Sequence, residues 1–165
     1  MHSIRRTFAG MTLAAAGALL LTACLDTPTE FECSAVVNQQ ASVRADSVVT
    51  TSGLIYRETQ VGTGAQVQST DDCQLVQVRY VGRLQDGTVF TQTPGTQVYA
   101  FTVGRHLLIE GFEQGVVGMR VGGSRQLIIP PALGYGDVPQ RDGAGNIVVP
   151  AGSTLIFDVT LVAVE

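Results

Sequence analysis

Short runs in which apolar and polar residues alternate recur through the chain after residue 52 and predict β-strands. The clearest run covers residues 75–84, where the even-numbered positions are mostly apolar. Further strands are predicted at residues 54–57, 89–90, 99–103, 125–129 and 154–164. The last of these is apolar on both faces, as expected of a central strand. Asp86 and Gly87 separate two of the runs and predict a tight β-hairpin.

Residues 109–119 are the one stretch after residue 52 with clear helical spacing. Ile109, Phe112 and Val116 recur at i, i+3 and i+7, which puts them on one helical face and points Glu113 elsewhere. Glycines and adjacent valines are poor helix formers, so packing against the sheet must hold this short helix. Phe112 is then either a core residue or the floor of a pocket, and the pattern alone favours the core.

The N-terminus has the pattern of an export signal. Two arginines precede an apolar run over residues 7–23, which ends in Leu-Thr-Ala-Cys at residues 21–24. This is the pattern at which bacterial lipoprotein signals are cut before a lipidated cysteine. We expect residues 1–23 to be a signal peptide and Cys24 to carry a lipid that anchors the protein in the cell envelope, facing the periplasm, with the outer membrane favoured by Leu25. An ordinary secretory signal or an uncleaved anchor is the alternative.

The segments outside the predicted strands are polar. Residues 24–51 are expected to be a lipidated tether and linker, with a short helix conceivable at residues 34–44, and residues 52–165 a single domain. Residues 131–150 are expected to be a long irregular loop, a feature that is usually functional. Asp137 and Asp142 in this loop could bind calcium, although two carboxylates in a glycine-rich loop are more often solvated.

Composition excludes several classes of function. All ten basic residues are arginine, so no lysine is present for Schiff-base or P-loop chemistry. Without the signal peptide, eight arginines face fourteen acidic residues, which argues against nucleic-acid binding. His106 is then the only histidine, so we expect no metal site, no cofactor and no histidine-dependent triad.

Two cysteines remain once Cys24 is lipidated. Cys33 and Cys73 are an even pair in an oxidising compartment, so we expect a disulfide between them. It would close a loop of about 40 residues and contribute on the order of 4 kcal/mol. The alternative is a pair of buried free thiols.

The ordered motifs resemble those of a known family. They are Val-Arg-Tyr-Val-Gly at residues 78–82, Asp-Gly-Thr-Val-Phe at 86–90, Ile-Glu-Gly-Phe at 109–112, Pro-Pro-Ala-Leu-Gly-Tyr-Gly at 130–136 and Thr-Leu-Ile-Phe-Asp at 154–158. In order and spacing they are similar to the FKBP family of peptidyl-prolyl cis/trans isomerases, in a bacterial lipoprotein form. The resemblance implies an α+β fold, in which a curved antiparallel β-sheet wraps around one short α-helix.

The resemblance also implies a pocket that receives a proline side chain. Its catalytic residues would be Tyr80, Phe90, Phe112, Tyr135 and Phe157, and its further substrate-binding residues Tyr99, Leu108, Ile109 and Val149. The backbone N–H of Ile109 and the hydroxyl of Tyr135 would each bind a substrate carbonyl. The family usually has an Asp where Thr91 stands, with an Arg from the loop that follows; residues 92–98 contain no Arg. This departure implies reduced activity or a shifted substrate preference.

The function implied is isomerisation of X-Pro bonds to assist the folding of exported proteins. The expected partners are proline-containing or unfolded polypeptides and, through the lipid, a membrane, with no nucleic acid and a monomeric domain. The alternative is a weakly catalytic or inactive chaperone that binds proline-containing or unfolded segments.

Overall fold

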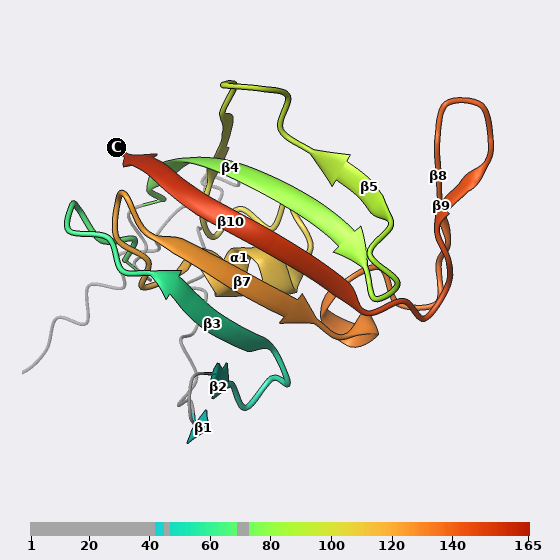
Figure 1. Ribbon diagram of the computed structural model, residues 1–165, viewed down its shortest axis with the longest axis horizontal. Coiled ribbons are helices and arrows are strands. Elements are labelled where there is room, and N and C mark those ends of the chain that lie inside the picture. Colours follow the sequence, from blue (N-terminus) through green and yellow to red (C-terminus); the bar gives the residue numbers. More distant parts are fainter. Residues whose placement is uncertain (1–41, 45–46, 69–72) are drawn as a thin grey trace, which may run out of the picture. The chain divides into compact units, whose positions relative to one another are not determined.

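One antiparallel sheet organises the protein. The computed structural model describes residues 42–44, 47–68 and 73–165, all within a compact unit of Phe31–Glu165. The strand order is β1-β2-β3-β7-β10-β4-β5, and β6 also pairs with β4 (Figure 1). The strands are β1 Ser42–Arg44, β2 Ser47–Val49, β3 Ile55–Gln60, β4 Leu75–Leu84, β5 Val89–Gln92, β6 Tyr99–Thr102, β7 Ser124–Ile129 and β10 Leu155–Val164.

Strand β10 lies at the centre of this sheet, as its apolar pattern predicted. It pairs with β7 on one side and β4 on the other. Alternate residues of β10, from Leu155 to Leu161, are buried because successive side chains of a strand point to opposite faces. The inward residues of β4, β7 and β10, apart from Arg125, therefore form one apolar surface, which covers the helix.

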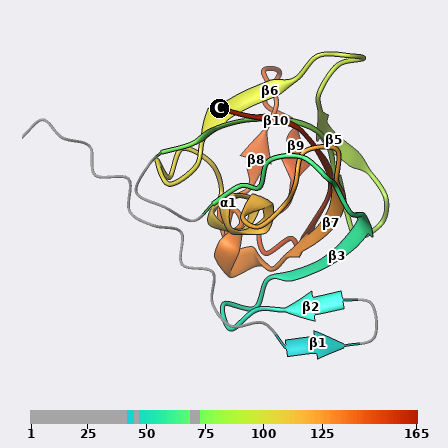
Figure 2. The ribbon, with the colours of Figure 1, turned by 90° about the vertical axis from the view of Figure 1, so that its left-hand side faces the viewer.

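The helix α1, Glu110–Val116, lies in the concavity of the sheet, and Figure 2 shows the strands curving around it. This confirms the predicted fold, although the helix is shorter than residues 109–119. It ends where Val117 takes an extended conformation. Gly115 allows the close approach, because a Cβ there would lie 2.4 Å from Cδ1 of Leu127 on β7. A residue with a side chain at this position would force the side chain of Leu127 or the helix to shift.

The predicted hairpin between β4 and β5 is confirmed. Gly87 has a φ of 89°, a left-handed conformation that glycine adopts without strain. The amide of Leu84 donates to the carbonyl of Thr88 across the turn at 2.9 Å. The hairpin places Phe90 and Thr91 beside β4.

The sheet begins earlier in the chain than the sequence indicated. Strands β1 and β2 pair with each other, and β2 pairs with β3, within residues assigned above to the linker. The described part of the possible helix at residues 34–44 is strand β1, and residues 34–41 lie outside the described residues. The β-branched Val43, Val48 and Val49 favour strands, but each run is only three residues long, too short for an alternating pattern to show.

Residues 131–150 are more ordered than the irregular loop predicted. They contain the 3-10 helix η1, Pro131–Leu133, and a hairpin of β8 Gln140–Arg141 and β9 Ile147–Val149. Asp142 builds the hairpin turn: its carboxylate accepts hydrogen bonds from the side-chain amide of Asn146 at 3.0 Å and from the N–H groups of Asn146 and Ala144 at 2.9 Å. The bonds from Asn146, with the further bond from Ala144, lower the pKa of Asp142 below its usual value. The carboxylate considered for calcium thus serves the turn.

Two kinds of feature are absent from the described residues. No helix in the described ranges is long and apolar enough to cross a membrane. Within the same part of the chain, no group of three or more His, Cys, Asp or Glu side chains is placed to hold a metal.

Candidate substrate-binding pocket

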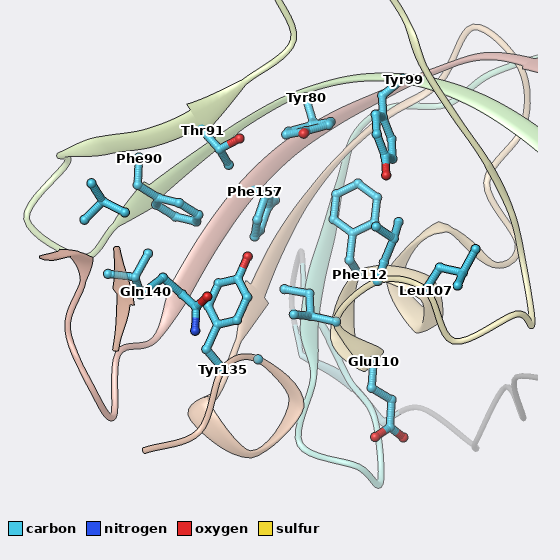
Figure 3. A pocket seen from close by; sticks show the side chains of 15 residues that line it. Tyr80, Phe90, Thr91, Tyr99, Leu107, Glu110, Phe112, Tyr135, Gln140 and Phe157 are labelled. Atoms are coloured by element: carbon cyan, nitrogen blue, oxygen red, sulfur yellow. The ribbon is translucent and has the colours of Figure 1, made fainter. Parts of the chain in front are cut away.

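A pocket of about 680 Å³ opens between the concave face of the sheet and the start of α1 (Figure 3). Strands β4, β5 and β10 form one side, the loop before α1 forms another, and η1 with the β8–β9 hairpin closes the third. The lining residues are mostly apolar or aromatic: Tyr80, Phe90, Thr91, Tyr99, Leu107, Leu108, Ile109, Glu110, Phe112, Gly134, Tyr135, Gln140, Val148, Val149 and Phe157.

Phe112 forms the floor of the pocket, at the centre of an aromatic cluster. Its ring meets the rings of Phe157, Tyr80 and Phe101 edge-on, with centroids 5.2, 5.6 and 5.8 Å apart. Edge-to-face packing is a favourable arrangement of aromatic rings and contributes beyond the burial of their surface. The floor is therefore rigid, apolar and of low dielectric.

The sheet sets the positions of the aromatic rings around this floor. Gly82 of β4 pairs with Phe157 of β10, and a Cβ on Gly82 would lie 2.6 Å from Cε1 of Phe157. Glycine at this position leaves room for the ring, which packs edge-on against Phe90 with centroids 5.6 Å apart. Tyr80 packs edge-on against Tyr99 of β6 at 5.9 Å and completes the wall.

Two hydrogen-bond donors belong to residues that line this apolar space. Figure 3 shows the hydroxyl of Tyr135 directed into the pocket toward Phe157. Burial, and then the nearby Tyr80, raise the pKa of Tyr135 above its usual value of 10.0, so the hydroxyl stays protonated at neutral pH. Ile109 precedes the first helical residue; its carbonyl accepts from Phe112, and no hydrogen bond found among the described residues uses its N–H. Both groups can donate to carbonyl oxygens of a bound chain.

Glu113 is buried, contrary to the prediction that it points away from the packed face. Its side chain is 1% exposed, and its two carboxylate oxygens accept from the N–H of Gly104 at 3.2 Å and of Leu108 at 3.3 Å. The loop between these two residues forms a wall of the pocket. We call this pair of bonds the Glu113 latch, because it ties the loop to the helix that carries Phe112.

Arg125 of β7 holds the other end of the helix. It faces inward, is 4% exposed, and donates from Nη1 to the carbonyls of Gly115 at 2.7 Å and Val117 at 2.9 Å. These carbonyls lie at the C-terminus of α1, where the helix leaves acceptors without internal partners. Glu58 pairs with the guanidinium, and the ring of Tyr56 lies 4.2 Å from its Cζ. In the sequence, Arg125 stands on the apolar face of a predicted strand, and this position was the signal that its side chain is buried.

All nine residues predicted for the pocket are brought together around it, and their roles in catalysis stay predictions. The sequence did not single out Leu107, Glu110, Gly134, Gln140 or Val148, which also line it, and Thr91 was noted only as a departure. Cys73 is disulfide-bonded. Its predicted partner Cys33 and the predicted lipidation site Cys24 lie outside the described residues.

Comparisons with known proteins agree with this geometry. A family model described as FKBP-type peptidyl-prolyl cis-trans isomerase matches residues 66–162. The chain is 37% identical over 138 residues to FK506-binding protein 4 of Mycosarcoma maydis, which covers 80% of this chain and 34% of that protein. It is 40% identical over 114 residues to peptidyl-prolyl cis-trans isomerase FKBP53 of Arabidopsis thaliana, covering 68% and 23% of the two chains. The chain thus spans about a third of one relative and about a quarter of the other.

Solved structures show the same fold. The crystal structure of AtFKBP13 superposes with a TM-score of 0.65 at 31% identity, covering 73% of this chain and all of that one. The crystal structure of FkpA from Escherichia coli gives a TM-score of 0.61, also at 31% identity, over 74% of this chain and 53% of that chain.

Proposed function

The chain belongs to the FKBP-type peptidyl-prolyl cis-trans isomerase family, and on this premise we propose that it catalyses the cis/trans isomerisation of X-Pro bonds in polypeptides. The observation that carries the proposal is the pocket itself. An apolar aromatic floor centred on Phe112 suits a proline ring, and the donors of Tyr135 and Ile109 lie on different walls around it. These groups can bind the carbonyls that flank the ring.

The reaction needs neither a nucleophile nor a metal. Rotation about the X-Pro amide costs about 20 kcal/mol because it breaks the resonance of the C–N bond. The planar amide is more dipolar than the twisted one, so transfer into an apolar pocket raises the free energy of the planar form more. The pocket then binds the twisted amide more tightly than the planar one, and this difference lowers the barrier. The hydroxyl of Tyr135 and the N–H of Ile109 hold the flanking chain in register while the bond turns.

The test is the cis-to-trans rate of a short X-Pro peptide with the purified protein and three variants. Phe112→Ala removes the floor, and Tyr135→Phe removes one donor. Val159→Ala is the matched control, since Val159 is a buried strand residue that does not line the pocket. We expect acceleration by the wild type and Val159→Ala, and a large loss in Phe112→Ala. No acceleration by the folded wild type would refute the proposal.

Thr91 favours a second function. It lies on the pocket wall as a neutral residue, at the position where the resemblance implied an acidic one. A weakly catalytic pocket would still bind proline-containing or unfolded segments as a chaperone. Suppression of the aggregation of an unfolded protein, without acceleration of the peptide, would select this function. Thr91→Asp would then be the variant to assay for restored activity.

We also propose that the protein acts outside the cytoplasm, anchored by a lipid on Cys24. The support is the cationic start, the apolar run and the Leu-Thr-Ala-Cys pattern at residues 21–24. Slow X-Pro isomerisation limits the folding of many proteins, so an isomerase facing the periplasm would assist exported chains. The mass of the protein purified from cells tests the anchor: processing at Cys24 with added acyl chains is expected, and an unprocessed or unmodified N-terminus would contradict it.

A disulfide between Cys33 and Cys73 belongs to the same proposal. The support is that Cys73 is disulfide-bonded. Peptide mapping without reductant should recover the two cysteines in one cross-linked fragment. Recovery of either as a free alkylated thiol would contradict the pairing.

A further inference from the structure

We propose that Leu107 and Glu110 form a subsite for a cationic side chain, so that the protein favours polypeptide segments with arginine or lysine close to the proline. The inference rests on the proposed function and specifies the substrate of the same pocket. The first observation is the distribution of charged side chains among the residues that line the pocket. Of the fifteen residues that line the pocket, Glu110 is the only one with a charged side chain. Thr91 and Gln140, on the opposite side, are polar but neutral.

The carboxylate of Glu110 is held in place although it is exposed. Ser52 donates from its hydroxyl to Oε1 of Gln114 at 2.7 Å, and the amide nitrogen of Gln114 donates to Oε1 of Glu110 at 2.8 Å. This relay engages one oxygen, and no hydrogen bond among the described residues uses the other. Figure 3 shows the carboxylate at the start of α1, directed away from the aromatic floor. A ligand can therefore reach it without entering the part of the pocket that suits proline.

Leu107 supplies the apolar half of the subsite. It lines the pocket, yet 74% of its surface is exposed, which is unusual for a leucine beside an apolar cavity. Figure 3 places it on the same side of Phe112 as Glu110. Arginine and lysine carry an apolar stem and a charged head, and they pack the stem on apolar surface while the head stays in water. The stem would lie on Leu107 and the head would meet Glu110.

The expected preference is modest because the charge is exposed. Exposed ion pairs have small free energies, which correspond to about a twofold to fivefold change in kcat/KM. The preference should fall toward onefold at about 1 M salt, where the screening length is only about 3 Å. An apolar or neutral residue at the same position would still bind, through Leu107 alone.

Arginine and citrulline peptides separate the contribution of the Glu110 charge from that of the apolar contact with Leu107. The two side chains have similar length and shape, and only arginine is charged. Isomerisation of otherwise identical proline peptides, with one or the other residue within two positions of the proline, is measured with the wild type, Glu110→Gln, Leu107→Ala and Glu165→Gln. Glutamine keeps the bond from Gln114 and loses the charge. Glu165→Gln removes the same charge at the exposed end of β10, outside the pocket lining.

We expect the arginine peptide to be turned over about twofold to fivefold more efficiently by the wild type and Glu165→Gln, and equally by Glu110→Gln. Leu107→Ala should slow both peptides by a similar factor. Equal rates with the wild type, or a preference that survives in Glu110→Gln, would overturn the subsite. Absence of any acceleration would instead refute the isomerase function. The ratio of the binding constants of the same two peptides, labelled with a fluorophore, would then decide the subsite.

Discussion

Replacement of Glu113 tests whether one buried carboxylate holds the wall of the pocket in place. The Glu113 latch consists of hydrogen bonds of 3.2 Å to Gly104 and 3.3 Å to Leu108. A hydrogen bond to a charged group contributes about 1.5–3 kcal/mol, and bonds longer than about 2.9 Å lie toward the lower end. The latch is therefore worth about 3 kcal/mol in total. This free energy opposes the opening of the loop.

Two variants of Glu113 should differ in a defined way. Glutamine keeps one acceptor oxygen but turns an NH₂ group toward the other backbone N–H, so Glu113→Gln should lose roughly half of the latch, about 1.5 kcal/mol. Glu113→Ala removes both acceptors and should lose about 3 kcal/mol. Since Leu108 and Ile109 line the pocket, the loosened wall should raise KM in both variants more than it lowers kcat.

Hydrogen exchange of the backbone amides of Gly104 and Leu108 measures the strength of the Glu113 latch directly. In Glu113→Gln the amides of Gly104 and Leu108 should exchange about tenfold faster, while amides of the central strand β10 keep their wild-type protection. Glu165→Gln, which removes an exposed carboxylate, is the control. Unchanged exchange of both loop amides in Glu113→Gln would show that the carboxylate does not hold the loop. Equally increased exchange in β10 would show that it stabilises the whole fold instead.

Two further predictions concern the helix and the tyrosine. Gly115→Ala should lower the free energy of unfolding, measured by urea titration, by about 1–2 kcal/mol, because its Cβ would lie 2.4 Å from Leu127. Gly143→Ala is the control and should be neutral, since a Cβ there has no atom within 4 Å. Equal urea midpoints of the two variants would refute the close approach. For Tyr135, whose pKa is raised in the fold, the contribution to stability is fully present below pH 10.0 and is lost as the pH rises through the folded pKa. As the pH rises from 9 to the alkaline limit of folding, the free energy of unfolding should therefore fall less in Tyr135→Phe than in the wild type.

The long strands could be predicted because each has enough residues to show a period. β4 and β10 each span ten residues, and their patterns predicted their positions; the two apolar faces of β10 also predicted its central place. β1 and β2 span three residues each, and no period can be recognised over that length. The β8–β9 hairpin was missed for another reason: its turn is built by the side chain of Asp142, a local polar contact that hydrophobic patterns do not report.

The contacts that hold the helix could not be predicted from its own sequence. Glu113 has polar partners in the loop before the helix, and Arg125 reaches the helix from a strand. Glu113 looks like an ordinary exposed charge until the fold brings its partners near, and the place of Arg125 on the apolar face of a strand does not name the helix carbonyls that it binds. The pocket shows the same limit: the spacing alone favoured a core role for Phe112, and only the resemblance to a family pointed to a floor. Glu110 was missed because an exposed carboxylate at the start of a helix has a common structural reason to be there.

The central position of β10 determines when the sheet can form during synthesis of the chain. β10 is the last described strand in the chain, and it pairs with β4 and β7, which are made earlier. Before residues 155–164 have been made, the two halves of the sheet have no strand to join them. Phe157, which packs against the floor of the pocket, arrives with the same strand. A nascent chain therefore gains this pocket only after residues 155–164 have been made, later than every other described strand that lines it.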